Sequence, residues 1–325
     1  MEQRHLGRSG LKVSRLALGT MTWGRDTDEH EAEDQLRAFV DAGGNLVDTA
    51  AAYGEGTSER VLGGLLADVI SRDDVVVATK AGVTGIDDTP DTSRRALLTT
   101  LDSSLNRLGT DHVDLWQVHV WSGGTPIDEV LATLDFAVSS GRARYVGVSN
   151  FAGWQTGWAA AWQLAWPGRV PLVSTQVEYS LVHRNAERDV LPAAQAAAMG
   201  LLAWSPLGRG VLTGKYRSGI PSDSRLATPH FEDFVRTHLD DRARRITDAV
   251  ATAADGLGVA PVEIALAWVR DQPGVVAPIV GARTAGQLLG SLQAEALTLP
   301  VEIMAALDDV SADSVEDELE PQPVS

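Results

Sequence analysis

The chain of 325 residues contains no cysteine. Without thiols it can form no disulfide, thiolate nucleophile, iron–sulfur cluster or cysteine-based zinc site, and this composition suits a reducing compartment. It also has no apolar run near the roughly 18 residues that a membrane-spanning helix needs, and its first five residues lead into no signal-like apolar core. We therefore expect a soluble, cytoplasmic protein.

Positive charge is scarce as well: 27 Lys and Arg stand against 44 Asp and Glu, a net charge of −17 at pH 7. This balance argues against a basic surface for nucleic acid or for an anionic membrane. Residues 302–325 hold eight of the acids and no Lys or Arg, so the rest of the chain is nearer −9 (−17 plus 8). We interpret residues 308–325 as an acidic, flexible tail and residues 1–307 as the folded part.

Short runs rich in Val, Leu and Ile alternate with longer segments of helical period along nearly the whole chain. Eight runs are predicted to be strands: Leu16–Leu18, Leu46–Asp48, Val75–Thr79, Leu115–Val118, Tyr145–Val148, Leu172–Gln176, Leu201–Trp204 and Val275–Ile279. The predicted helices are Asp28–Ala42, Ser58–Ala67, Thr92–Leu108, Pro126–Ser140, Phe151–Trp166, Arg188–Met199, Pro261–Arg270 and Thr284–Ser291. Eight such units favour a single closed (β/α)8 TIM barrel over an open doubly wound sheet, which usually stops at about five or six strands.

In such a barrel the carboxyl ends of the strands form the face that carries the active site. The longest departure from regular alternation is residues 208–240, a segment with several Gly and Pro. We expect it to extend over that face and to fold over a ligand.

Polar side chains follow three consecutive predicted strands. Asp48, Lys80 and His119 each stand at a strand end, and Tyr53 lies five residues beyond Asp48. A barrel brings all four to one mouth, where burying a Lys, an Asp and a Tyr together is costly unless they pair. A lysine ammonium beside a phenol favours the phenolate and lowers the pKa of the tyrosine, which suits proton transfer near neutral pH. Taken singly, such an Asp is more often a helix cap, such a Lys more often solvated and such a His more often structural, and it is their joint placement on three successive strands that favours catalysis.

The segment 45–50 (Asn-Leu-Val-Asp-Thr-Ala), followed by Tyr53-Gly54, Ser58-Glu59 and Leu62-Gly63, resembles a signature of the aldo-keto reductase superfamily. The resemblance extends over nearly the whole chain, from residues 18–21 to residues 281–284. It implies that Asp48, Tyr53, Lys80 and His119 form that family's catalytic tetrad.

The family mechanism, carried over to these positions, implies reduction of an aldehyde or ketone by hydride from NADPH. Tyr53 is then the general acid, Lys80 paired to Asp48 lowers its pKa, and His119 orients the carbonyl.

The chain has no Gly-x-Gly-x-x-Gly; the segment 208–214 comes nearest, with its last glycine one place too late. A Rossmann domain is therefore disfavoured, and the resemblance implies NADPH bound across the barrel mouth. The implied cofactor-binding residues are Gly19, Thr20, Met21, Asp48, Ser149, Asn150, Gln176, Trp204, Ser205, Pro206, Leu207, Gly208, Gly210, Gly281, Arg283 and Gln287. Arg283 is assigned to the 2′-phosphate. The chain departs from the family at Gly290-Ser291, where Glu-Asn is frequent.

Nine tryptophans are present. Trp23 and Trp121 follow the first and fourth strands, and with Tyr53 and His119 they predict an aromatic pocket for an apolar or aromatic aldehyde or ketone. Trp154, Trp158, Trp162 and Trp166 recur every four residues along one helical stripe. We interpret this stripe as packing against a neighbouring helix or the barrel wall, with a subunit interface in a homo-oligomer as the alternative.

Two other functions compete with a carbonyl reductase acting on a small-molecule substrate. One is an NADPH-binding regulatory or redox-sensing subunit with little turnover, similar to the potassium-channel β subunits that share this fold. The other is a metal-dependent barrel hydrolase, but the seven histidines show neither His-x-His nor His-Glu-x-x-His spacing, so no metal is expected.

Overall fold

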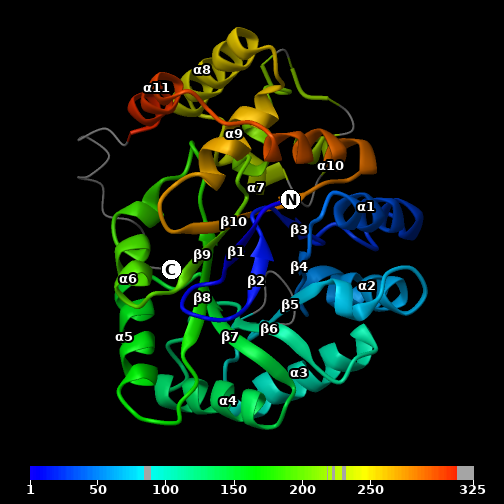
Figure 1. The fold of residues 1–325 in the computed structure, drawn as a ribbon, viewed down its shortest axis with the longest axis vertical. Helices are drawn as coiled ribbons and strands as arrows, with labels where there is room; N and C mark the ends of the chain where they lie inside the picture. Colours follow the sequence, from blue (N-terminus) through cyan, green and yellow to red (C-terminus); the bar gives the residue numbers. More distant parts are fainter. Residues whose placement is uncertain (84–88, 218, 222–223, 229–231, 313–325) are drawn as a thin grey trace.

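The computed structural model describes residues 1–83, 89–217, 219–221, 224–228 and 232–312. Within these residues, eight parallel strands close into a barrel in the order β10-β3-β4-β5-β6-β7-β8-β9 (Figure 1). The strands are β3 (Ala17–Gly19), β4 (Leu46–Asp48), β5 (Val76–Ala81), β6 (Val113–Val118), β7 (Ala143–Ser149), β8 (Leu172–Glu178), β9 (Gly200–Trp204) and β10 (Val275–Gly281). The predicted (β/α)8 TIM barrel is confirmed.

Helices surround the barrel: α1 (Glu29–Asp41), α2 (Thr57–Asp68), α3 (Arg94–Leu108), α4 (Ile127–Ser139), α5 (Gly153–Leu164), α6 (Val190–Ala196), α9 (Pro261–Arg270) and α10 (Ala285–Leu292). Their ends follow the usual chemistry, as α1 illustrates. Asp28 caps its first turn by accepting from the backbone N–H of Glu31, while Leu36 and Phe39 on its inner face are fully buried. The barrel strands, covered on their outer face by these helices, therefore read as continuous apolar runs.

An N-terminal hairpin that the sequence did not predict closes the bottom of the barrel. Its strands are β1 (Gln3–His5) and β2 (Lys12–Ser14), paired antiparallel. Leu6 in the turn is fully buried and belongs to the same cluster as barrel residues such as Leu46 and Leu202. The next residue, Gly7, has φ +56°, and a Cβ there would lie 2.4 Å from the backbone oxygen of Val173, so only glycine fits.

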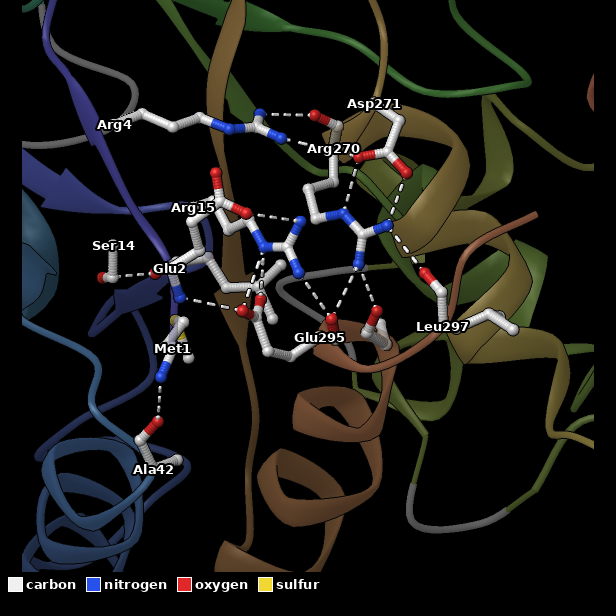
Figure 2. A network of polar contacts seen from close by, with 12 residues as sticks. Met1, Glu2, Arg4, Ser14, Arg15, Ala42, Arg270, Asp271, Glu295 and Leu297 are labelled. Carbon is white, nitrogen blue, oxygen red and sulfur yellow. Dashed lines mark hydrogen bonds and ion pairs between the residues drawn. The ribbon is translucent and has the colours of Figure 1, made fainter.

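A polar network fastens this hairpin to the C-terminal part of the chain (Figure 2). Arg4 donates to the backbone oxygen of Arg270 at 2.6 Å. Arg15 pairs with Glu295 at 2.9 Å, and the buried guanidinium of Arg270 pairs with Asp271. Elements from both ends of the chain are thus joined beside the seam between β3 and β10.

The sequence also missed α8 (Asp241–Leu257), which begins at the capping residue Asp240 and ends at Gly258 in the left-handed conformation. Its buried residues, including Ile246 and Val250, pack with α9. No single helix in the described residues is long and apolar enough to cross a membrane; α8 and α9 meet those criteria only together, across a bend of 103°.

The mouth segment 208–240 contains η4 (Gly208–Thr213), η5 (Arg225–Ala227) and α7 (Glu232–Arg236) in its described parts. Residues of this segment line the cavity described below. Its remaining positions, 218, 222–223 and 229–231, lie outside the described residues.

The predicted boundary between fold and tail, at residues 307 and 308, falls inside α11 (Val301–Ser311). Trp268 donates its indole N–H to the carboxylate of Asp308 at 2.9 Å, and Arg184 donates to the backbone oxygen of that residue. Residues 308–311 are therefore part of the packed structure. The rest of the expected acidic tail, residues 313–325, lies outside the described residues.

Candidate active site

Three strand ends and one short turn bring the predicted tetrad together at the mouth. Asp48 ends β4, Lys80 is the next-to-last residue of β5, and His119 directly follows β6. The Nζ of Lys80 lies 2.6 Å from Oδ2 of Asp48 and 3.2 Å from the hydroxyl of Tyr53. It also donates to the backbone oxygen of Thr49 at 2.9 Å. The Tyr53 and His119 rings meet edge to face, with centroids 6.1 Å apart.

Tyr53 owes its position to an unusual turn, η1 (Tyr53–Gly56). Gly54, Glu55 and Gly56 have φ of 55°, 54° and 81°, three successive residues in the left-handed region. For Glu55 this conformation is strained, and such strain is typical of functional turns. A Cβ at Gly56 would lie 2.6 Å from Nε of Arg107, so glycine is needed where this arginine packs beneath the turn.

A buried ion pair supports the turn and the lysine strand together. Glu59 of α2 is fully buried and pairs with Arg107 of α3, whose Nε lies 2.7 Å from one carboxylate oxygen. The other oxygen accepts from the hydroxyl of Thr79, the residue before Lys80. The sequence singled out Glu59 only as part of the family signature; its role as a support is visible only in the fold.

The electrostatics of Lys80 and Tyr53 depend on their burial. Burial lowers the pKa of Lys80, but Asp48 and Tyr53 raise it, and the net pKa lies above the ordinary value, so Lys80 stays charged. Burial raises the pKa of Tyr53, Lys80 opposes this, and the net pKa is also raised. The expected lowering of the tyrosine pKa is therefore wrong for this state of the protein: loss of hydration outweighs the attraction of Lys80. The phenol is protonated at neutral pH.

His119 is neutral over the physiological range. Burial and, to a smaller extent, the nearby charge of Lys80 together lower its pKa to about 3. Among the described residues, its Nδ1 has no hydrogen-bond partner. A neutral imidazole can donate one hydrogen bond to a ligand without bringing a positive charge into the site.

A cavity of about 580 Å³ opens beside the tetrad, within the usual size range of ligand sites. Most of the predicted cofactor residues line it: Gly19, Met21, Asp48, Ser149, Asn150, Gln176, Trp204, Ser205, Pro206, Leu207, Gly210, Gly281, Arg283 and Gln287. Two others lie behind the lining. Thr20 is fully buried, with its hydroxyl 2.7 Å from that of Ser58, and Gly208 is buried against Val182.

Polar side chains near the tetrad form a linked set. Gln176 donates to Asp48 at 2.8 Å, and Ser149 donates to the backbone oxygen of Gln176 at 2.9 Å. Asn150 has φ +54°; it donates to the backbone oxygen of His119 and accepts from the indole N–H of Trp204, both at 2.9 Å. These bonds fix one hydroxyl, two amides and one indole on a common wall, a polar surface suited to a carboxamide.

Another part of the cavity lining is suited to phosphates. Ser205, Arg209 and Gly210, all with positive φ, belong to a tight turn that lines the cavity. Arg209 and Lys215 also line the cavity. The sequence did not predict these two cations as cavity residues, although both lie in the expected mouth segment. The residues present therefore fit the pyrophosphate of a dinucleotide.

Arg283 lies at the far rim of the cavity, where β10 leads into α10. Its guanidinium donates to the hydroxyl of Thr228 at 2.9 Å and lies 4.0 Å from Asp26, while its backbone N–H donates to Gln287. Ser291, at the site of the family departure, is buried and donates to the backbone of Gln287.

Neither tryptophan predicted for the substrate pocket lines the cavity. Trp23 is fully buried, and its indole N–H donates to Gln35 at 3.0 Å, so it belongs to the core under α1. Trp121 turns toward α5 and packs on Phe151, with centroids 5.1 Å apart. The other two predicted pocket residues, Tyr53 and His119, do line the cavity, together with the apolar residues Met21, Val83, Pro90 and Val120.

One polar cluster near the mouth was not visible in the histidine spacing. Glu178, His183 and His238 place one ligand atom each within 4.8 Å of one another. Arg209, however, binds Glu178 at 2.6 Å, and His238 lies 2.9 Å from the same carboxylate. This arrangement serves as an ion pair that holds the mouth segment on β8. His230, the remaining histidine of the segment, lies outside the described residues.

Comparison with known proteins agrees with this geometry. The family model described as "Aldo/keto reductase family" matches residues 15–312. The chain is 38% identical to "Uncharacterized oxidoreductase YrpG" of Bacillus subtilis, over 95% of this chain and 96% of that protein. It is 35% identical to a "Probable voltage-gated potassium channel subunit beta" of Oryza sativa (90% and 91%), and 33% identical to the "L-glyceraldehyde 3-phosphate reductase" of Escherichia coli O157:H7 (95% and 93%). The barrel, the tetrad geometry and these matches lead to one conclusion: the chain belongs to the aldo/keto reductase family.

Proposed function

We propose that this protein is an NADPH-dependent oxidoreductase that reduces an aldehyde or ketone to an alcohol, with Tyr53 as the general acid. The observation that carries the proposal is the chain of contacts from Asp48 through Lys80 to the Tyr53 hydroxyl, 2.6 Å and 3.2 Å, beside a cavity large enough for a ligand. When bound, the nicotinamide supplies the hydride.

Tyr53 then completes the reduction by giving its proton to the carbonyl oxygen. The raised pKa keeps the phenol protonated until the substrate needs the proton. Once the proton has left, the ammonium of Lys80 stabilises the phenolate, and Asp48 keeps that ammonium charged in a buried site. The same three residues thus hold the proton beforehand and stabilise the charge afterwards.

His119 and Gln176 position the reacting groups. A neutral His119 can donate a hydrogen bond to the carbonyl oxygen and polarise it, which favours attack at the carbon. Gln176 is held by Asp48, and Asn150 is held between His119 and Trp204. We propose that these side chains hold the carboxamide and that the Trp204 ring packs on the nicotinamide.

We propose NADPH rather than NADH because the distal end of the cavity carries Arg283. A guanidinium binds phosphate through two parallel hydrogen bonds, which suits the 2′-phosphate. The cavity is lined by the apolar residues Met21, Val83, Pro90 and Val120 and by the rings of Trp204 and Phe234, which supports an apolar or aromatic carbonyl compound as substrate.

Tyr53→Phe tests the proposal directly, because it removes one hydroxyl and keeps the ring. NADPH binding, followed by quenching of tryptophan fluorescence, should stay nearly intact, while kcat for reduction of 4-nitrobenzaldehyde should fall by about 10²–10⁴-fold, the usual contribution of general acid catalysis. Equal turnover by the variant and the parent would show that the acid assignment is wrong.

A second function has a specific observation behind it, the relatives named as probable potassium-channel β subunits. By that proposal the protein binds NADPH as a regulatory or redox-sensing subunit. The two proposals differ in turnover: rapid reduction across a panel of aldehydes, ketones and sugars supports the enzyme, whereas tight NADPH binding without turnover supports the sensor.

A further inference from the structure

The surface of α5 carries large aromatic side chains in contact with solvent. Trp154, Trp158 and Trp166 are 62%, 46% and 64% exposed, and Leu164 is 60% exposed. The expectation that the stripe packs inside the protein is therefore wrong for these three tryptophans; only Trp162 is partly buried against the core. Large exposed apolar patches mark interaction sites in soluble proteins.

The rings at the start of α5 form one preorganised cluster with Trp121. Trp154 and Trp158 stack with centroids 6.1 Å apart, and Trp121 meets them at 5.5 Å and 6.0 Å. Trp121 is itself anchored on Phe151. We call the surface made by Trp121, Trp154 and Trp158 the tryptophan face; Leu164 and Trp166 add exposed apolar side chains at the C-terminal end of α5. Rings that are already packed lose little conformational freedom when a partner covers them.

The tryptophan face has no charge of its own. Residues 151–168 contain no Asp, Glu, Lys or Arg, in a chain with a net charge of −17. A basic partner would need acidic residues on or around this helix surface, and α5 offers none. Two copies of an acidic protein repel each other least where the facing surfaces are neutral. The charge pattern therefore favours a second copy of this chain over a basic partner.

The position of the face on the outside of the barrel leaves it open to a second copy. α5 lies on the outside of the barrel, between α4 and α6 (Figure 1). A Cβ added at Gly157 would meet nothing within 4 Å, so no described residue covers α5 at this position. The three exposed indoles leave about 400 Å² of ring surface per copy, roughly half of the ~800 Å² per partner that a stable interface buries.

We propose that this chain forms a two-fold symmetric homodimer through the tryptophan face, with α5 of one copy packed against α5 of the other. A two-fold interface uses the same patch on both subunits, so a single neutral aromatic helix surface is sufficient to build it. The oligomer is independent of the reaction, because it does not use the tetrad or the cavity.

Sedimentation velocity of the full chain, from 0.5 to 100 µM, tests the dimer. The parent should sediment as a dimer, and the combined change Trp154→Glu and Trp158→Glu should raise the dimer dissociation constant by 30-fold or more (~2 kcal/mol for a central tryptophan). Leu289→Glu, compared with Trp154→Glu alone, is the matched control: it places one negative charge on α10, at a side chain that is 48% exposed, and should leave the dimer intact.

Two further measurements keep the outcome clear. Gly157→Lys adds a charge to the face without removing a ring, so it should also weaken the dimer, and circular dichroism must show that each variant is folded. Raising NaCl from 0.1 to 0.5 M should preserve or strengthen an uncharged interface between two acidic copies. A parent that stays monomeric at 100 µM, or an oligomer that survives both face variants, would overturn the proposal.

Discussion

Replacing Asp48 by Asn removes one buried charge while keeping the shape of the side chain. Asp48 is 2% exposed and accepts from Lys80 at 2.6 Å and from Gln176 at 2.8 Å. In the variant the fully buried Lys80 ammonium keeps only neutral acceptors, the backbone oxygen of Thr49 at 2.9 Å and the hydroxyl of Tyr53 at 3.2 Å. The amide nitrogen of Asn must also face a group that is itself a donor.

The expected cost follows from this loss of the counter-charge. Removing one partner of a buried ion pair destabilises a protein by about 3–5 kcal/mol, a large share of a typical unfolding free energy of about 5–15 kcal/mol. At roughly 2–4 °C per kcal/mol for a large domain, Tm should fall by about 6–20 °C.

The loss of stability in Asp48→Asn should depend on pH in a definite direction. In the parent, the raised pKa of Lys80 means that its contribution is complete at neutral pH and disappears only as pH rises through the pKa of the folded state. In the variant, burial still lowers the pKa of Lys80, but the Asp48 charge that raised it most is gone. We therefore expect the pKa of Lys80 in the folded variant to lie below that in the unfolded chain. The stability deficit of Asp48→Asn should then shrink as pH rises from 7 toward about 10.

Thermal and urea unfolding, followed by circular dichroism at pH 7 and 9.5, measure both effects. The double variant Asp48→Asn and Lys80→Met removes the stranded charge and should recover much of the lost stability, but no activity. Asp73→Asn, at an exposed site, is the charge-matched control and should change stability by less than about 0.5 kcal/mol. The reasoning fails if Asp48→Asn is as stable as the parent, or if the double variant is less stable than the single one.

Two further predictions concern Arg283 and His119. Arg283→Ala should raise the dissociation constant for NADPH by about 10–150-fold, the effect of losing charge-assisted hydrogen bonds worth about 1.5–3 kcal/mol, and should change NADH binding far less; equal effects in fluorescence titrations would contradict a contact with the 2′-phosphate. The pKa of His119 is lowered to about 3 in the folded protein. As pH drops, the imidazole is therefore protonated in the unfolded chain before it is protonated in the folded protein. The free energy of unfolding should then fall with a slope of up to about 1.4 kcal/mol per pH unit between about pH 6.5 and 3. His119→Phe should flatten urea-unfolding stability between pH 7 and 5, and an unchanged slope would assign the acid sensitivity to other groups.

The barrel was predictable because its signals are local. Strands covered on both faces need uninterrupted apolar residues, and each following helix repeats with its own period. Asp48, Lys80 and His119 could be grouped without coordinates because all strands of such a barrel end at the same face. The helix α8 was missed because it follows the irregular mouth segment, which hid the start of the next regular element.

The errors share a physical cause: each concerns the direction or the hydration of a side chain. Trp23 and Trp121 stand in mouth loops by sequence, yet one turns into the core and the other toward α5. The pKa of Tyr53 depends on the balance between burial and Lys80, and residue order alone does not set that balance. The same holds for the stripe on α5, where helical spacing is identical for a buried and an exposed face.

Residue order by itself therefore determined the barrel, its working face and the identity of the four residues at that face, since these follow from periodicity and from where strands end. Only the tertiary structure decided how those residues act. The 2.6 Å pair of Asp48 and Lys80, the protonated phenol of Tyr53 and the uncovered tryptophans all depend on which groups lose water on folding and which groups replace that water. Contacts between residues far apart in the chain set that exchange, and they exist only once the barrel has closed.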